Sequence, residues 1–194
     1  MRSEAEDIER GLASKFKKEF GALSDRMNRS PNGDPLIWLI PNQLAASRRP
    51  LRDHPNFEDY VHQDNLPPHA GPIIRIWLEK IVEAGVHSVI CLLPNWQLRR
   101  YIGLPGMDGG LLTLYESRGL EVRQVACPDP QHEKVEKGWL EQIKPQAYEA
   151  FLGLTKPVLL HCSAGIDRSS PVAAYIACHV RDDLRLGIRG RTVV

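Results

Sequence analysis

The N-terminal part of the chain carries apolar residues at helical spacing. Ile8, Leu12, Phe16 and Phe20 follow one another in steps of four and are surrounded by charged residues. This is the pattern of an amphipathic helix with one buried stripe. It predicts a helix over residues 4–23, followed by a polar break that is rich in proline and glycine.

Beyond residue 36, short apolar runs alternate with helical patterns. The runs predict strands at residues 36–40, 88–93, 120–125 and 157–160. The helical patterns predict helices at residues 72–85, 110–117, 135–153, where Pro145 would kink or split the helix, and 169–180. Strands that alternate with helices indicate βα units, so we expect an α/β fold with a mostly parallel central sheet of about four or five strands and helices on both faces.

The same pattern suggests how the 194 residues are divided. Residues 1–35 are expected to be an N-terminal helix and linker, residues 36–186 the single α/β domain, and residues 187–194 a loose tail. Within the domain, residues 47–70 show little periodicity and are expected to form an irregular loop. Their arginines Arg48, Arg49 and Arg52 form a basic cluster that could receive an anionic substrate, although such a run more often lies on a solvated face.

Composition narrows the class of protein. The 25 Lys and Arg residues and 24 Asp and Glu residues leave a net charge of +1, so no global field attracts nucleic acid. The N-terminus carries acidic residues from the start, and no stretch reaches the roughly 18 apolar residues of a membrane span. The four cysteines form no CxxC pair. We therefore expect a cytoplasmic protein with free thiols, no membrane span and no nucleic-acid partner.

The candidate chemistry lies in a segment near the C-terminus. After the predicted strand at residues 157–160, the chain reads His161-Cys162-Ser163-Ala164-Gly165-Ile166-Asp167-Arg168-Ser169 and then enters a helix. A strand–loop–helix passage points several backbone N–H groups inward and adds the positive end of the helix dipole. Such a nest binds a dianionic phosphoryl group, so we expect phosphate or sulfate to bind in this loop.

The residue types in this loop predict separate roles. Cys162 lies in the electropositive field of the loop, where a thiol ionises readily, and is the candidate nucleophile. The planar fork of Arg168 can hold two phosphoryl oxygens. Gly165 permits a turn where a Cβ would crowd the phosphate. Ser169 can donate a hydrogen bond to the sulfur, and His161 can fix the loop through hydrogen bonds.

The other loop residues complete the predicted phosphate site. We expect the substrate to be bound by Ser163, Ala164, Gly165, Ile166, Asp167 and Ser169. Nucleophilic catalysis of this kind needs no metal ion and no organic cofactor.

The loop resembles the signature of the cysteine-dependent protein tyrosine phosphatase superfamily. The small size of the chain resembles the small atypical dual-specificity phosphatases, and the segment Ile40-Pro41-Asn42-Gln43-Leu44-Ala45-Ala46-Ser47 resembles their entry strand. The likeness spans residues 36–186. The resemblance implies a tyrosine-phosphatase-like fold. It also implies hydrolysis of phosphotyrosine, phosphoserine or phosphothreonine on proteins or peptides through a cysteinyl-phosphate intermediate.

A phosphatase of this family also uses an aspartate that protonates the leaving oxygen. Asp129 lies 33 positions before Cys162 and is followed by Pro130, which suits a hinged turn. Asp167 is the rival, because the order Cys-x-x-Gly-x-Asp-Arg resembles the loops of myotubularin lipid phosphatases and of bacterial phosphatases that act on phosphoinositides. We favour Asp129 as the acid because its loop can move.

Other functions remain open at this point. Asp167 keeps a phosphoinositide phosphatase as an alternative. A catalytically inactive phosphate-binding module is a second, although no catalytic residue of the motif is missing. Rhodaneses and arsenate reductases also place a cysteine before an arginine, but the pair His161–Cys162 and the late position of the loop disfavour them.

Overall fold

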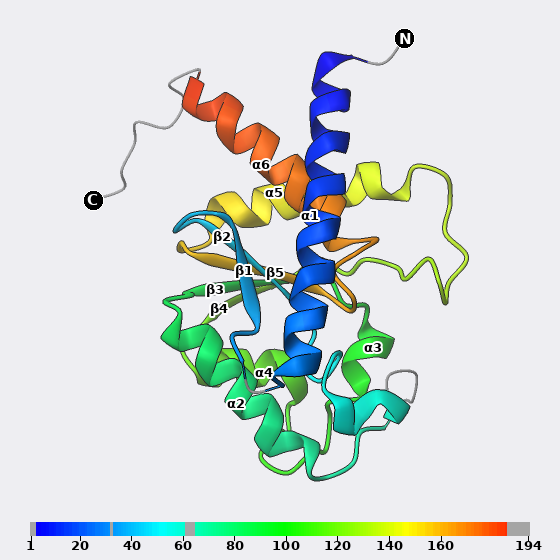
Figure 1. Ribbon diagram of the computed structural model, residues 1–194, viewed down its shortest axis with the longest axis vertical. Helices are drawn as coiled ribbons and strands as arrows, with labels where there is room; N and C mark the ends of the chain where they lie inside the picture. Colours follow the sequence, from blue (N-terminus) through cyan, green and yellow to red (C-terminus); the bar gives the residue numbers. More distant parts are fainter. Residues whose placement is uncertain (1–2, 32, 61–64, 186–194) are drawn as a thin grey trace.

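The computed structural model describes residues 3–31, 33–60 and 65–185 and contains one five-stranded sheet in the order β1-β2-β5-β3-β4 (Figure 1). Strands β2, β5, β3 and β4 run parallel to one another, and the edge strand β1 runs antiparallel to β2. The expected α/β class with a mostly parallel sheet is therefore confirmed. The strands are β1 (Leu36–Ile40), β2 (Leu44–Arg48), β3 (Ser88–Cys91), β4 (Glu121–Gln124) and β5 (Val158–Cys162).

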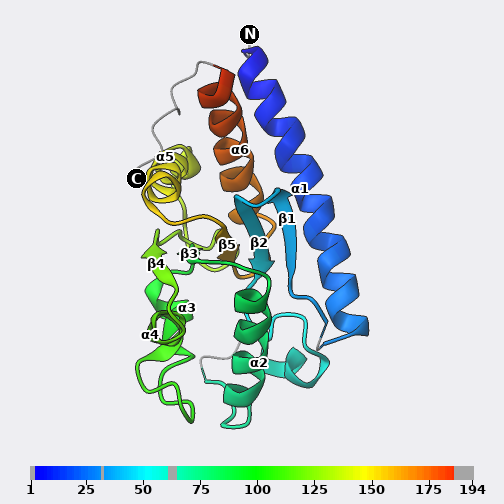
Figure 2. The same ribbon diagram turned by 90° about the vertical axis from the view of Figure 1, so that its left-hand side faces the viewer.

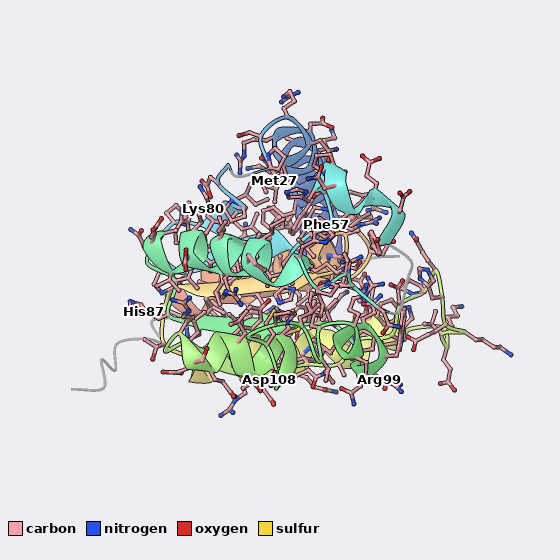
Figure 3. All side chains as sticks on the ribbon, turned by 90° about the horizontal axis from the view of Figure 1, so that it is seen from below. Met27, Phe57, Lys80, His87, Arg99 and Asp108 are labelled. Carbon is pink, nitrogen blue, oxygen red and sulfur yellow. The ribbon has the colours of Figure 1, made fainter. Side chains whose placement is uncertain are left out.

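Helices cover both faces of this sheet. Helices α2 and α4 pack on one face, and α5 and α6 pack on the other together with the first half of α1. Figure 3 views the molecule from the side of α2 and α4, whose side chains fill the space toward the sheet. The helical elements are α1 (Glu4–Arg29), η1 (Pro55–Tyr60), α2 (Ala70–Glu83), α3 (Asn95–Arg99), α4 (Gly110–Ser117), α5 (Trp139–Gly153) and α6 (Ser169–Arg185).

The central strand β5 is buried along its whole length. Because side chains alternate across a sheet, Leu159 joins the core beneath α2 and α4, whereas Leu160 joins the core beneath α5 and α6. The same alternation sends His161 toward Tyr115 of α4 and leaves Cys162 in the α5–α6 core. A strand that is buried on both faces has a continuous apolar sequence, which is why β5 could be predicted from the sequence.

Helix α1 is part of this core rather than an appendage. It begins with a capping box in which Ser3 and Glu6 satisfy each other's backbone amides. Figure 2 shows α1 lying along α6 and continuing past the β1 edge of the sheet. Its buried residues Phe16, Phe20 and Leu23 face these neighbours. The partly buried Met27 continues the apolar stripe beyond the predicted end at residue 23, and the helix ends at Arg29.

The structure differs from the sequence prediction at several helices and loops. Residues 47–70 are not wholly irregular, because β2 extends to Arg48 and η1 forms a further element. Helix α5 begins only at Trp139 and continues through Pro145 as one helix. Helix α3 was not predicted, and the expected tail at residues 187–194 lies outside the described residues. None of the described helices is both long and apolar enough to cross a bilayer.

Candidate active site

The parallel strands bring the predicted site residues to one edge of the sheet. Arg48 at the end of β2 and Cys162 at the end of β5 are paired across the parallel ladder. The carboxyl ends of parallel strands are the usual position of binding sites in α/β sheets. A pocket of about 140 Å³ opens at this edge, and its lining includes Cys162, Arg168, Asp129, Gln97, Arg48 and Arg52.

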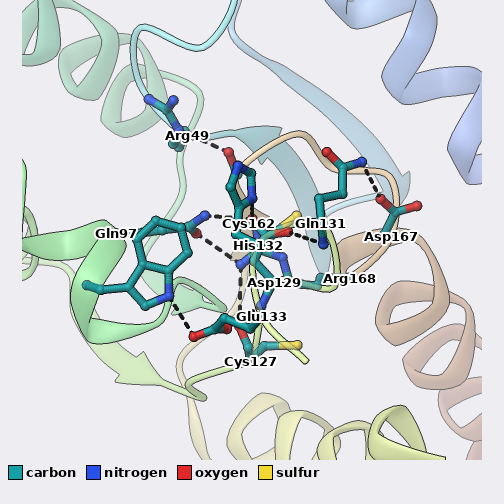
Figure 4. Close-up of polar contacts among 12 residues, drawn as sticks. Arg49, Gln97, Cys127, Asp129, Gln131, His132, Glu133, Cys162, Asp167 and Arg168 are labelled. Atoms are coloured by element: carbon teal, nitrogen blue, oxygen red, sulfur yellow. Dashed lines mark hydrogen bonds and ion pairs between the residues drawn. The ribbon is translucent and has the colours of Figure 1, made fainter. Parts of the chain in front are cut away.

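The loop after β5 folds back on its own first residue (Figure 4). The Gly165 backbone N–H donates to the Sγ atom of Cys162 at 3.2 Å. Ser170 Oγ donates to the Gly165 carbonyl oxygen at 2.7 Å and ties the middle of the loop to the first turn of α6. Of the several inward amides that the sequence predicts, this contact shows one.

Gly165 is required for a reason that the sequence did not reveal. Its φ of +78° is strained for any residue with a Cβ. A Cβ at this position would collide with the ring of Phe20, which α1 presses against the back of the loop. The atoms nearest to such a Cβ belong to Phe20, and crowding of a bound phosphate stays a prediction.

The Arg168 guanidinium is buried, and three acceptors hold it. It binds Asp129 Oδ2 at 2.9 Å, Gln97 Oε1 at 3.0 Å and the Cys127 carbonyl oxygen at 3.3 Å. A bound phosphoryl group would therefore have to compete with Asp129 for this guanidinium. The structure brings Arg168 and Asp129 together as a pair, which the sequence did not predict.

Asp129 sits at the centre of a hydrogen-bond network. Its Oδ2 atom also accepts from Gln97 Nε2 at 2.6 Å, and its Oδ1 atom accepts from the Gln131 backbone N–H at 3.2 Å. Burial by itself raises the pKa of Asp129, but the Arg168 guanidinium and these hydrogen bonds leave that pKa below its ordinary value. In this arrangement Asp129 is a carboxylate at neutral pH.

A second carboxylate fixes the loop that carries Asp129. Glu133 Oε2 accepts from the Asp129 backbone N–H at 2.6 Å, and Glu133 Oε1 accepts from Trp96 Nε1 at 2.7 Å. Trp96 and Gln97 are neighbours in α3, so this short helix holds the Asp129 loop through two separate contacts. The sequence prediction missed α3, Gln97 and Glu133, since five residues after a proline carry no clear helical period.

His161 is wholly buried and neutral. Desolvation lowers its pKa to about 4. Its Nδ1 atom lies 3.4 Å from the Cys162 carbonyl oxygen, and its Nε2 atom lies 3.1 Å from the Tyr115 hydroxyl. Because a carbonyl oxygen can only accept, Nδ1 carries the proton and Nε2 accepts from Tyr115. His161 thus has the predicted supporting position behind the loop.

The remaining predicted residues lie around the pocket in different ways. Ser163, Ala164, Ile166 and Asp167 line it. Asp167 is exposed at the rim and accepts from Gln131 Nε2 at 3.2 Å. The predicted hydrogen bond from Ser169 to the sulfur is not formed, because the buried Ser169 Oγ has no partner among the described residues.

The arginines after β2 correct another expectation. Arg48 and Arg49 are only 8% and 3% exposed, so they do not lie on a solvated face. Arg49 Nε donates to Ser163 Oγ at 3.1 Å, and the Arg49 backbone N–H donates to the Ser163 carbonyl oxygen at 3.1 Å. This segment therefore borders the loop of Cys162 directly.

Two other cysteines near the pocket are protonated thiols. Burial raises the pKa of Cys91 and of Cys127 to about 12. Neither can act as a thiolate at neutral pH. Across the described residues, no three His, Cys, Asp or Glu side chains converge in a way that could hold a metal ion.

Comparison of the whole chain with protein-family models found no match, and comparison with curated proteins found no significant match. The geometry of the pocket is therefore the main indication of function.

Proposed function

We propose that the chain is a phosphatase that hydrolyses phosphomonoesters through a cysteinyl-phosphate intermediate on Cys162. One observation carries the proposal: the loop turns back so that the Gly165 amide donates to the Cys162 sulfur, while Arg168 and Asp129 lie in the same pocket within hydrogen-bond distance of each other. A nucleophile, an anion clamp and an acid are the groups that phosphoryl transfer through a thiol requires.

In the first step the Cys162 thiolate attacks phosphorus. A P–S bond forms as the P–O ester bond breaks, and Asp129 transfers its proton to the leaving oxygen. The inward amides of the loop and the Arg168 fork stabilise the charge on the phosphoryl oxygens. General acid catalysis by a positioned carboxyl group typically contributes about 10²–10⁴-fold.

Substrate binding itself protonates the acid. A phosphate dianion in the loop draws the Arg168 guanidinium away from Asp129 and places negative charge next to that carboxylate. Both effects raise the pKa of Asp129 from its lowered value. Gln97 accepts from Arg168 and donates to Asp129, so it is a positioning residue that holds the acid while the arginine changes partner.

In the second step a water molecule attacks the phosphorus of the intermediate. Asp129, now a carboxylate, accepts a proton from this water as the P–S bond breaks. Inorganic phosphate leaves, and Cys162 is again a thiolate. The Arg168–Asp129 pair then forms again.

The family resemblance supplies the substrate class that we propose. A central parallel strand followed by this loop and a helix agrees with a small atypical dual-specificity phosphatase, whose substrates are phosphotyrosine, phosphoserine or phosphothreonine on proteins. Free thiols suit a reducing compartment, so we place the enzyme in the cytoplasm. Asp167 at the pocket rim keeps a phosphoinositide phosphatase as the second candidate.

Steady-state hydrolysis of an aryl phosphate tests the proposal. The comparison uses the wild type, Cys162→Ser, Asp129→Ala and Asp167→Ala. Cys178→Ser is the matched control, because this cysteine lies on α6 outside the pocket. We expect Cys162→Ser to abolish turnover and Cys178→Ser to retain it.

Three results would contradict parts of the proposal. Turnover by Cys162→Ser would show that Cys162 is not the nucleophile. Phosphate binding without turnover by the wild type would indicate the inactive module instead. Release of phosphate from phosphoinositides far above that from phosphopeptides would favour the lipid phosphatase.

A further inference from the structure

The three arginines at the end of β2 and in the segment after it differ in how their charges are compensated. Arg48 forms an ion pair with Asp53 at 2.5 Å, and Asp53 also accepts from Ser24 Oγ of α1 at 2.9 Å. Arg49 donates to Ser163 Oγ and to the Tyr101 hydroxyl. Other groups of the protein therefore hold both guanidinium groups in place.

Arg52 lacks such a partner. Within the part of the chain that the structure describes, no residue forms a hydrogen bond or ion pair with its guanidinium, and its Nε atom is buried. Burial lowers the pKa of Arg52, and the charges of Arg49 and Arg48 lower it further. The carboxylates of Asp53 and Asp129 offset part of this lowering but form no hydrogen bond or ion pair with the guanidinium. Holding a half-buried cation beside two others without a directly bound counterion costs free energy, which a bound anion would reduce.

The position of Arg52 indicates where that anion lies. Arg52 and Arg48 line the same pocket as Cys162. The nearby carboxylate of Asp129 is already paired with Arg168, and that of Asp53 with Arg48. A phosphoryl group held by the loop and Arg168 would therefore leave Arg52 available to a second anion on the same substrate.

We propose that Arg52, next to Arg48, forms a second anion subsite, and that preferred substrates are phosphopeptides in which another phosphate or carboxylate lies close to the scissile phosphate. The proposal rests on the proposed phosphatase function. The pocket wall favours a peptide as the carrier: Trp96 and His132 line it with ring centroids 5.7 Å apart. Such an aromatic wall suits the ring of phosphotyrosine better than the hydroxyl groups of an inositol ring.

Binding to the Cys162→Ser variant tests the subsite without any need for turnover. Two synthetic peptides are compared by calorimetry: one with a single phosphotyrosine among neutral residues, and one with an added phosphothreonine two residues before it. We expect the second peptide to bind about tenfold more tightly, which corresponds to about 1.4 kcal/mol. Adding Arg52→Gln should remove this difference, and Arg52→Lys should restore part of it.

Arg118→Gln is the matched control. It also removes one positive charge, but Arg118 is exposed, pairs with Glu79 and lies outside the pocket. In this background the ratio of the two dissociation constants should stay at its original value. A similar loss in Arg118→Gln would mean that net charge, rather than Arg52, sets the preference.

Two results would overturn the proposal. The first is equal binding of both peptides, or a preference that survives Arg52→Gln. The second is a preference dependent on Arg52 that appears only between an inositol monophosphate and an inositol bisphosphate with neighbouring phosphates, because this would assign the subsite to a lipid headgroup. Failure of aryl phosphate hydrolysis by the wild type would refute the proposed function alone, because the binding experiment does not depend on it.

Discussion

Two segments leave neighbouring parallel strands at the same edge of the sheet, and they build the pocket in different ways. Residues 162–168 begin with the last residue of β5 and form their part with backbone: an amide that faces the sulfur and a glycine with positive φ. Residues 48–53 begin with the last residue of β2 and contribute side chains, namely guanidinium groups held by Asp53 and Ser163. Arg48 and Cys162, which begin the two segments, are paired across the ladder.

This difference shows which kind of site can be predicted from a short stretch of sequence. A backbone nest needs particular residue types at fixed spacing, and these are visible along the chain as a motif. Buried arginines carry no such mark, because arginines in a loop usually lie in solvent. Only the pairing of β2 with β5 shows that these arginines border the loop.

The largest effect should come from the acid that faces the loop. Asp129→Asn keeps the hydrogen-bonding shape but removes the proton donor. We expect kcat for phenyl phosphate, a poor leaving group, to fall about 10²–10⁴-fold. The loss should be much smaller for 4-nitrophenyl phosphate, whose leaving group needs little protonation. Asp167→Asn should lose far less with both substrates, and a larger loss there that depends on the leaving group would reverse the assignment.

The loop at residues 162–168 depends on its backbone conformation, which predicts the next largest effect. Gly165→Ala adds both positive-φ strain and a collision with Phe20. We expect a loss of about 4 kcal/mol in the free energy of unfolding. Gly85→Ala is the matched control, because Gly85 has a similar φ of +82° and nothing within 4 Å of an added Cβ; it should lose about 1 kcal/mol. Urea titrations measure both.

The substitution Phe20→Ala separates the cost of the collision from the cost of the backbone strain. In that background the collision is absent, so Gly165→Ala should cost only the backbone strain of about 1 kcal/mol. An undiminished cost would show that α1 does not support the loop.

The buried imidazole behind the loop predicts a dependence of stability on pH. Burial lowers the pKa of His161 from its ordinary 6.5 to about 4. Below pH 6.5 the unfolded chain binds a proton that folded His161 does not, so stability falls as the pH drops from about 6.5 to 4. The loss attributable to His161 is roughly 3 kcal/mol.

Denaturant titrations between pH 7 and 4 measure this loss. His161→Gln should flatten the decline by that amount, whereas replacement of exposed His87 by Gln should leave the wild-type decline. An unchanged decline in His161→Gln would mean that other groups cause it.

Residues 48–53, which contribute side chains to the pocket, predict the smallest effect on stability. Arg48 and Asp53 form a pair whose side chains are only 10% and 9% exposed. Asp53→Asn leaves Arg48 partly buried without its counterion, and we expect a loss of about 2 kcal/mol in the free energy of unfolding, less than for a deeply buried pair because the pocket admits solvent. Glu79→Gln breaks the exposed Arg118 pair and should cost below about 0.5 kcal/mol. Equal losses would show that the β2 segment is solvated after all.

Most elements of the fold could be predicted because their residues mark them locally. Pro72 lies in the first turn of α2, Gly119 follows α4, and the apolar run at residues 157–160 falls within β5 apart from its first residue. Strand β2 was expected only from the resemblance of residues 40–47 to an entry strand, because its sequence Leu44–Arg48 is neither alternating nor rich in β-branched residues. Its small alanines are buried in the sheet, and only tertiary packing explains that burial.

The site could be predicted only as far as the motif extends. Cys162 and Arg168 lie in one loop, and Asp129 at its expected separation lines the same pocket. Gln97 and Phe20 could not be predicted, since they reach the site from α3 and α1 through contacts between residues distant in sequence. The contact of Arg168 with Asp129 likewise follows from the relative positions of β4 and β5, which no local pattern encodes.

Chemical trapping of the intermediate tests the central claim most directly. The wild type is mixed with an aryl phosphate and quenched in acid within the first turnover, and its peptides are analysed by mass spectrometry. The account predicts one phosphoryl group on the peptide that contains Cys162, attached to that sulfur, and none in Cys162→Ser. Turnover with no phosphoryl group on Cys162, or with the group on another residue, would contradict it.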